Sequence, residues 1–548
     1  MKITPRQMVL SVFTLLVLGL GVGAYFFHWR RKNAVADYKR ELLAAGEKLT
    51  VTELWPRPVP AEQNSVPILN KLAFGRSQQK RSLFETNEPP LMRMVKPGKA
   101  MVGWAQPDIR EHSTNSWEEA EALLAQDDSS LQLIQQITQQ PALDFQLDYR
   151  AGFNLMLPHL APLKQATVRL AQASVCDLHR GNADRAALRV EAMLAIVKGS
   201  AAERLVISQL VRMAIAHITL TATWELLQSP NSTEAQLAKL QHDWAEVEFM
   251  QATEDALLME RAMSEATLAQ MRNSSGAFRS VATGWRSGSG GSGSGDWFRQ
   301  AGEMTLLKTK ETLWHFAWSY PDQLRSLKGH QAILEAVRMV KNGQPFEVAF
   351  RQEEQKLAAL GIEVRKEDSN FMIFDMNNMD LRSLFSQSVL SLQRLLHRVL
   401  AAEVARQMAV TAIALKRYHL SHGRYPSDLT TLTPEFVPAM PRDPVDGQPL
   451  RYRVQPDGNF LLYSIGEDGQ DNVGDPSSIV KTKSPTWQKG RDWVWPQPAT
   501  MEEVSAYYQE MAARESPATV MDPAANESFR KRYGLAAPTN SAATNLTK

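Results

Sequence analysis

The chain has 548 residues, and its 61 Lys+Arg against 59 Asp+Glu leave a formal net charge of only +2. This balance excludes a uniformly basic nucleic-acid-binding sleeve, so no nucleic-acid partner is expected. A hydrophobic content of 44% with 29 Gly and 29 Pro is ordinary for folded material. The single cysteine, Cys176, excludes an intramolecular disulfide and a cysteine-based zinc cluster.

Residues 8–27 form an apolar stretch without a charged residue. At 1.5 Å per residue, a helix of this length spans about 30 Å, the thickness of a bilayer's hydrocarbon core. We therefore predict a transmembrane anchor over residues 1–32, an uncleaved signal anchor with Tyr25 and Trp29 in the headgroup layer. A buried helix of a soluble fold and a cleaved signal peptide are the alternatives.

The charges that flank this stretch favour a body on the cytoplasmic side. Lys2 and Arg6 precede the stretch, whereas a larger set of cations that includes Arg30, Arg31 and Lys32 follows it. The positive-inside rule places the more basic flank in the cytoplasm. Charge alone therefore opposes export of the body.

Two glycines within the apolar stretch, Gly19 and Gly23, form a GxxxG pair. Such a pair lets two membrane helices approach closely, although glycine is also common in single membrane helices. A homodimer through Gly19 and Gly23 and an incidental occurrence of the motif are both open.

The next segments alternate between extended and helical patterns. Residues 33–115 are punctuated by prolines and are expected to be extended. A capping box at residues 116–119 opens a helical domain over 116–272. Within this domain, residues 163–198 are similar to a single tetratricopeptide-type hairpin that turns at Gly181. A plain helical bundle and a repeat-like array are both open.

Composition divides the second half of the chain into four parts. Residues 273–296 are rich in Gly and Ser and are expected to be a flexible linker, whether natural or introduced. Residues 297–399 are expected to be helical, and 400–498 to form a small α+β domain. Residues 499–548 are expected to hold a short helix and a disordered tail. The overall fold class is therefore mainly α.

The small α+β domain is predicted from local patterns. Apolar residues recur every three or four positions from Val404 to Tyr418, which predicts a long helix with Gly423 as a left-handed C-cap. Alternating residues over 450–464, with a turn at Gly458, predict a β-hairpin packed on that helix. The aromatic residues at 493 and 495 are expected to pack on the domain, with an exposed binding edge as the alternative.

This order of elements over residues 404–475 resembles the C-terminal domain of the major pseudopilin of type II secretion, general secretion pathway protein G. The motifs that carry the resemblance are Gly423-x-Tyr425-Pro426, Asp443-Pro444 and Tyr463-Ser464-x-Gly466-x-Asp468-Gly469. The resemblance implies a small α+β domain whose last loop binds calcium. The layout of the whole chain is also similar to uncharacterised multi-domain membrane proteins of Planctomycetes and Verrucomicrobia, which implies no activity.

The resemblance implies a metal site at Asp468, Asp471 and Asp475, which align with the calcium loop of the family. The chemistry agrees in kind, since Ca²⁺ prefers hard oxygen ligands and a glycine-rich loop can turn carbonyls inward beside carboxylates. A solvated acidic turn, in which the glycines only permit positive φ, is the alternative.

The chain also departs from the pseudopilin pattern. The apolar stretch lies far upstream of residues 404–475 and contains no acidic residue. We therefore expect neither processing by prepilin peptidase nor polymerisation into a pseudopilus.

The combined prediction is a single-pass protein of the bacterial inner membrane whose body is periplasmic, as the resemblance implies. It acts as a scaffold or interaction protein with protein partners and is stabilised by Ca²⁺. The alternatives are an envelope hydrolase with its site in the helical body and a cytoplasm-facing helical adaptor. No catalytic residue is predicted, because the sequence has no Walker loop and no GxSxG elbow.

Overall fold

The computed structural model describes residues 5–71, 91–109, 116–140, 142–284, 305, 308–362, 382–478, 488 and 490–514. Across these residues the chain is mainly helical, as predicted. One large core connects the helical body with the C-terminal strands, because buried side chains from Met94 to Trp495 belong to the same apolar cluster.

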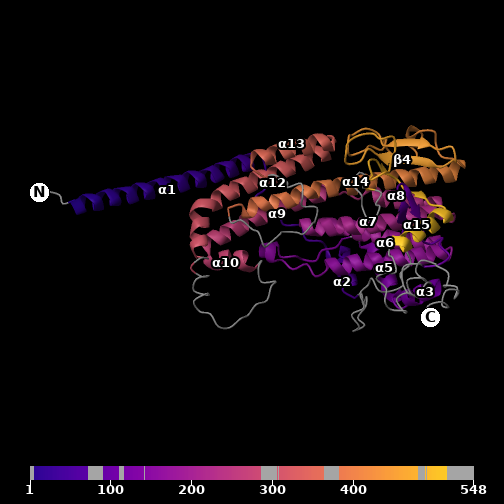
Figure 1. Ribbon diagram of the computed structural model, residues 1–548. Helices are drawn as coiled ribbons and strands as arrows, with labels where there is room; N and C mark the ends of the chain where they lie inside the picture. The colour runs from indigo at the N-terminus through magenta and orange to yellow at the C-terminus, as the bar shows by residue number, and fades with distance from the viewer. Residues whose placement is uncertain are drawn as a thin grey trace, which may run out of the picture.

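The first helix, α1 (Pro5–Ala44), is continuous and projects from the body (Figure 1). It continues past residue 32, where the sequence predicted an extended segment. Its last turns pack apolar side chains against the body, and this packing stabilises the helix there. Val35 and Leu42 are buried there, and α1 packs against α12 (Ser319–Lys341).

A small sheet joins segments that are far apart in the sequence. Strands β1 (Arg93–Lys96) and β2 (Lys99–Met101) form an antiparallel hairpin, and β6 (Gln497–Pro498) pairs with β2 in parallel. Helix α15 (Met501–Arg514) packs its buried Tyr508 into an apolar cluster with this sheet. The short helix predicted after residue 499 is therefore confirmed, and residues 515–548 lie outside the described residues.

The other helices of the body are α2 (Val66–Leu69), α3 (Trp117–Ala125), α4 (Asp128–Gln135), α5 (Leu160–His179), α6 (Ala183–Gly199), α7 (Val206–Gln228), α8 (Glu234–Ala245), α9 (Met250–Asn273), α10 (Ser275–Gly284), α13 (Phe346–Ala359) and α14 (Leu384–His422). The shorter helical turns are η1 (Ala61–Gln63), η2 (Gln136–Gln139), η3 (Tyr149–Asn154), η4 (Ser200–Ala202), the π-helical η5 (Trp314–Trp318) and η7 (Leu429–Leu432).

The helices pack as a bundle. α5 and α6 form the predicted hairpin, which turns at Gly181 with φ of 76°. α7 contacts α5, α6, α9 and α14, and α14 also contacts α8 and α12. In a repeat array each hairpin contacts only its neighbours, so this long-range packing favours the bundle.

By length and composition, α7 is the helix among the described residues that meets the criteria for a membrane span, and 61% of its apolar window is buried. Because α7 packs against four other helices, its apolar side chains are already covered by protein. We interpret it as the central core helix of the bundle.

The predicted flexible linker begins with a helix. α10 occupies residues 275–284, and its Phe278 is fully buried in a cluster that includes Leu268 and Trp314. Burial of this one large aromatic side chain outweighs the low helix propensity of the Ser- and Gly-rich surroundings. Residues 285–296 of the predicted linker lie outside the described residues.

A second sheet lies at the end of the body opposite to the projecting part of α1 (Figure 1). It has the order β3 (Arg451–Val454), β4 (Phe460–Ser464), β5 (Trp493–Val494), and all its pairs are antiparallel. The predicted hairpin is confirmed, and β4 contacts α14. Trp493 and Trp495 are buried, so they pack on the domain and the alternative of an exposed edge is wrong.

The predicted boundary between residues 399 and 400 falls inside α14, which runs without a break from Leu384. Both halves of this helix are held by the same core, since Leu396 and Met408 belong to one apolar cluster. The helix of the pseudopilin-like segment is thus also a helix of the bundle.

Candidate functional site

Within residues 404–475, the loops and strands begin where α14 ends at His422. Gly423 adopts φ of 70° and its amide donates to the His419 carbonyl at 2.8 Å, which is the predicted left-handed cap. The Tyr452 hydroxyl on β3 then donates to the Pro426 carbonyl at 2.7 Å. This bond ties the hairpin to the chain that leaves the helix.

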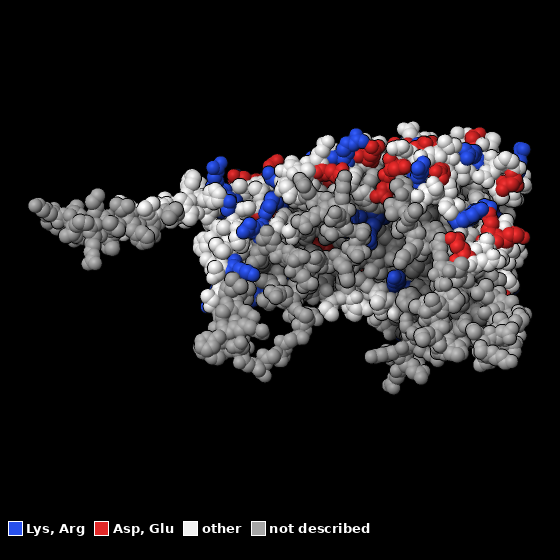
Figure 2. Space-filling view, in the orientation of Figure 1, with Lys and Arg blue, Asp and Glu red and all other residues white. Residues whose placement is uncertain are grey.

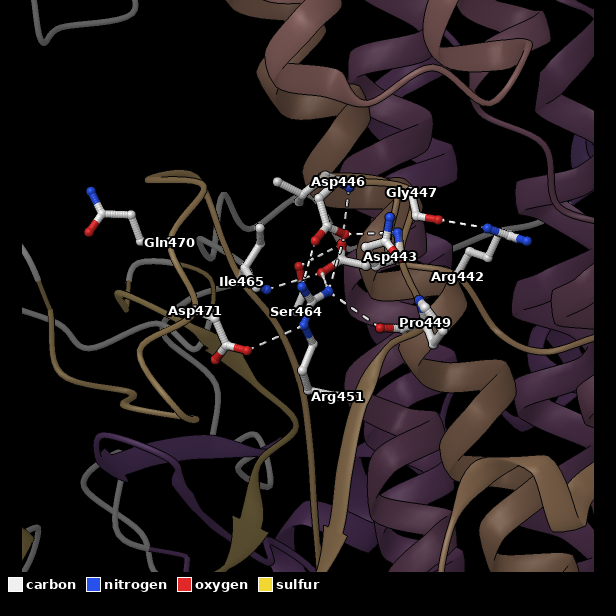
Figure 3. Close-up of polar contacts among 12 residues, drawn as sticks. Arg442, Asp443, Asp446, Gly447, Pro449, Arg451, Ser464, Ile465, Gln470 and Asp471 are labelled. Carbon is white, nitrogen blue, oxygen red and sulfur yellow. Dashed lines mark hydrogen bonds and ion pairs between the residues drawn. The ribbon is translucent and has the colours of Figure 1, made fainter.

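A fully buried carboxylate, Asp443, holds the loop before β3 against the end of β4 (Figure 3). It accepts hydrogen bonds from the Val445 amide at 3.0 Å, the Ser464 hydroxyl at 2.9 Å and the Ile465 amide at 3.0 Å. Burial raises the pKa of Asp443, and these donors oppose the rise. The sequence pointed to Asp443 only as part of a motif and predicted no role for it.

Arg451 connects this network to the acidic loop (Figure 3). Its guanidinium donates to both carboxylate oxygens of Asp446, at 3.1 and 2.5 Å. The same guanidinium lies 3.4 Å from Asp443 and 3.6 Å from Asp471. One cation therefore lies within 3.6 Å of three carboxylates, and it offsets at most one of their three negative charges.

The three predicted metal ligands each cap the backbone of their own loop. Asp468 accepts from the Gln470 amide at 3.0 Å, Asp471 from the Val473 amide at 2.9 Å, and Asp475 from the Ser477 amide at 2.9 Å. Asx turns of this kind hold a loop without a metal.

The side chain that organises the acidic loop is Asp492, which the sequence analysis missed. Its buried carboxylate accepts from the amides of Asn472 at 3.2 Å, Gly474 at 2.6 Å and Asp475 at 3.0 Å. Burial raises the pKa of Asp492 in spite of these donors. The available signal was an acidic residue directly before the buried strand residue Trp493.

Within the described residues, no group of three or more His, Cys, Asp or Glu side chains is placed to hold a metal ion. The site that the resemblance implies combines carboxylates with main-chain carbonyls, which this finding does not address. Calcium binding stays a prediction of the resemblance alone.

Calcium can be tested by thermal unfolding of the full chain in detergent with and without millimolar Ca²⁺. A ligand held only by the folded state raises the midpoint, so the resemblance predicts a rise that Asp468→Ala abolishes. Mg²⁺ at the same concentration controls for ionic strength. An unchanged midpoint in the wild-type protein would show that the folded chain does not bind Ca²⁺ at millimolar concentration.

The loop before β3 contacts the bundle through α13, and the acidic loop contacts it through α14. The Phe346 amide at the start of α13 donates to the Val445 carbonyl at 2.9 Å. His397 of α14 packs edge-on against Phe350 with ring centroids 4.3 Å apart, and it lies 3.6 Å from Glu467 in the loop. The pseudopilin-like segment is thus held by two helices of the body as well as by its own strands.

Two open clefts lie near this junction. The first, of about 230 Å³, has walls from α7 and α14 that are largely apolar, and its polar side chains are His217, Arg398 and Gln488. The second, of about 460 Å³, lies between the start of α9, the end of α12, α14 and the loop that holds Asp443. Its cations already have partners, as Arg406 shows by its bond to Glu403.

The carboxyl groups with strongly raised pKa values do not line these clefts. Burial raises the pKa of Glu225 and of Glu353 to about 8, and neither residue lines either cleft. Glu225 accepts from the Gly103 amide at 2.9 Å, which is a structural role. Burial lowers the pKa of His217 in the first cleft, but an acid or base needs a positioned partner as well. The hydrolase alternative therefore gains no support from the described residues.

Comparison of the chain with protein-family models, with curated proteins and with solved structures found no match in any of the three. The resemblance of residues 404–475 to protein G accordingly rests on its motifs and its order of elements. It enters the functional argument only as a proposal.

Proposed function

We propose that this chain is a single-pass membrane protein of the bacterial envelope whose helical body carries a pseudopilin-like module away from the bilayer. It acts there as a scaffold or interaction protein. The observation that carries the proposal is the exposed apolar surface of α1.

The apolar side chains that the structure describes between residues 14 and 27 of α1 are exposed. Leu15 is 68% exposed, Val22 69% and Tyr25 72%, whereas Val35 and Leu42 farther along the same helix are buried. Residues 8–27 of this helix include no charged residue, and the coloured part of the projection in Figure 2 is white up to the body. Exposing so long an apolar helix to water is unfavourable, and a bilayer supplies the missing apolar contact. Its twelve Leu, Val and Phe residues favour insertion by about 4–7 kcal/mol in total.

A buried ionic cluster fixes α1 to the body. Glu47, just after α1, pairs with the fully buried Arg261 of α9 at 2.7 Å and also with Arg338 of α12. Arg338 in turn donates to Glu254 of α9 at 2.6 Å. We call these four residues the Glu47 cluster. Because the cluster joins the turn after α1 to α9 and α12, a membrane-embedded α1 would set the position of the whole body.

The far end of the body supports a role in interaction. The sheet of β3, β4 and β5 lies at the end opposite to the projecting part of α1 (Figure 1). An anchor at one end and a compact α+β module at the other suit a protein that presents a surface at a distance from the membrane. The resemblance favours a periplasmic body, and the flanking charges oppose it.

Two lysines in the projecting helix are expected to release the protein from membranes. In the variant Leu18→Lys/Val22→Lys, each lysine costs about 2.5–3.5 kcal/mol near the centre of a span, which together offset the favourable insertion energy. Membranes washed with alkaline carbonate should retain the wild-type protein and lose the variant.

The matched control places two lysines at exposed apolar positions of the body. Leu188 and Val348 are 50% and 49% exposed, so Leu188→Lys/Val348→Lys should stay in the membrane fraction. Recovery of the wild-type chain in the soluble fraction would contradict the proposal. Fusion of alkaline phosphatase to the C-terminus, active only after export, distinguishes the periplasmic body from the cytoplasm-facing adaptor.

A further inference from the structure

A short segment of the body lies beside α1 where α1 leaves the proposed bilayer. Residues 308–313 are helical and lead into η5 at the start of α12. The Nδ1 atom of His28 lies 3.1 Å from the Phe316 carbonyl oxygen, and the two rings are 5.6 Å apart. The Arg31 guanidinium donates to the Ala317 carbonyl at 2.5 Å. These contacts fix the segment at the level of the first cations after the apolar stretch.

The outer face of this segment is apolar and exposed. Leu313 is 46% exposed and Phe316 63%, and the two are three residues apart, so they lie on the same side of the helix. Thr309 and Thr312 are exposed on the same side. We call these four residues the 309–316 face.

The threonines of the 309–316 face do not need water as a partner. The Thr309 hydroxyl donates to the Thr305 carbonyl and the Thr312 hydroxyl to the Lys308 carbonyl, each at 2.9 Å. A hydroxyl whose proton is already bonded to the backbone costs less to remove from water. The face can therefore enter the boundary between headgroups and acyl chains without leaving a threonine hydroxyl proton unpaired.

The charges around the face are mostly positive. Lys308 and Lys310, both exposed, are sequence neighbours of Thr309 on the body. On α1, the exposed Arg30 and Lys32 are the sequence neighbours of Arg31, which contacts Ala317. Glu311 is the one acidic residue among the described residues of 305–318. Cations within a few ångströms of a bilayer are attracted by anionic lipids.

We propose that the 309–316 face is a second membrane contact, which seats the body on anionic lipid headgroups beside the point where α1 enters the bilayer. This inference rests on the proposed membrane anchor. Continuity with α1 and the surrounding cations favour a lipid surface over a protein partner as the occupant. The body would then have a fixed orientation relative to the membrane rather than swing on α1.

The contact can be tested with the full chain in vesicles that contain brominated lipids, which quench a nearby fluorophore. A fluorophore is attached to one introduced cysteine at a time: Thr312→Cys for the face, Val22→Cys for the anchor and Val348→Cys for an exposed site on α13. The native Cys176 is buried, and burial raises the pKa of its thiol to about 12, so it reacts slowly with the label.

Vesicles of phosphatidylcholine alone are compared with vesicles of equal parts phosphatidylcholine and phosphatidylglycerol. We expect quenching at 22 in both, quenching at 312 mainly with phosphatidylglycerol, and none at 348. In the Thr312→Cys protein, the added changes Leu313→Gln/Phe316→Gln should abolish quenching at 312 and lower the unfolding midpoint only slightly, because both side chains are exposed and the backbone contacts to His28 and Arg31 remain.

Quenching at 22 without quenching at 312 would overturn the second contact and leave the anchor intact. Absence of quenching at both positions would overturn the anchor as well. Equal quenching at 312 in the two kinds of vesicle would overturn the role of the anionic headgroups. Quenching at 312 that persists in the Leu313→Gln/Phe316→Gln protein would show that these side chains do not make the contact.

Discussion

Replacement of Glu47 by glutamine is expected to lower the free energy of unfolding by about 3 kcal/mol. The change leaves the guanidinium of Arg261 fully buried without its carboxylate. Loss of one partner of a buried ion pair costs about 3–5 kcal/mol. We expect the lower end, because Arg261 keeps hydrogen bonds to Gln331 and to the Lys48 carbonyl. Urea unfolding of the full chain in detergent, followed by tryptophan fluorescence, measures the loss.

The same substitution should change the response to acid. Burial alone would raise the pKa of Glu47, but hydrogen bonds from Arg338 and Arg261 lower it from 4.5 to about 2. A carboxyl whose pKa is depressed in the folded state stabilises above the unfolded value and loses that contribution as the pH falls from about 4.5 towards 2. Glu47→Gln removes this part of the acid sensitivity.

The matched control is Glu41→Gln on α1. Glu41 is exposed, so the substitution removes the same charge without opening a buried pair. Its effect should stay within about 0.5 kcal/mol. Equal losses from Glu41→Gln and Glu47→Gln would contradict the structural role of the Glu47 cluster.

Asp443→Ala is expected to lower the free energy of unfolding by a similar amount, about 3 kcal/mol. The change leaves the Val445 and Ile465 amides and the Ser464 hydroxyl without their acceptor in a buried site. Each buried unpaired polar group costs about 1–3 kcal/mol, partly relieved by water that enters the space. Urea unfolding measures the total, and hydrogen exchange at the Ile465 amide reports the local effect.

Two variants make the Asp443 result specific. Asp443→Asn keeps one acceptor oxygen but turns an amide donor towards part of the site, so we expect a smaller loss. Asp457→Ala removes an exposed carboxylate that accepts from Asn459 in the turn of the same hairpin, so it should cost much less than Asp443→Ala. If Asp443→Ala costs no more than Asp457→Ala, the buried network does not hold the module.

Elements with strong local signals were predictable from the sequence. Gly423 followed by Pro426 marks the end of α14, and alternation around Gly458 marks the hairpin of β3 and β4. Each depends on backbone preferences or side-chain periodicity within a few residues. The α5 and α6 hairpin was predictable for the same reason.

Features that depend on distant partners were not predictable. The pairing of β6 with β2 joins Gln497 to Lys99, and the Glu47 cluster joins Glu47 to Arg338, which lies 291 residues later in the sequence. Nothing near these residues in the sequence indicates the partner. The helix α10 was missed because a single side chain, Phe278, finds its buried site through tertiary packing.

The candidate site was likewise only partly predictable from the sequence. Its acidic loop was visible as a run of Asp and Gly, but Asp492, which holds the loop amides, comes from a later segment of the chain. Asp443 was visible within a motif, whereas its bonds to Ser464 and Ile465 follow only from the fold. Sequence patterns therefore located the module but not the buried carboxylates that shape it.

The membrane anchor is tested most directly by spin labels placed singly along α1 in the full chain in vesicles. Collision rates with oxygen, which concentrates in the bilayer, and with a water-soluble nickel complex report the depth of each label. Labels at Leu18 and Val22 should be immersed, whereas a label at Leu43, an equally apolar residue that is 51% exposed, should be in water. Equal access of the nickel complex to all three positions would contradict a bilayer-embedded α1.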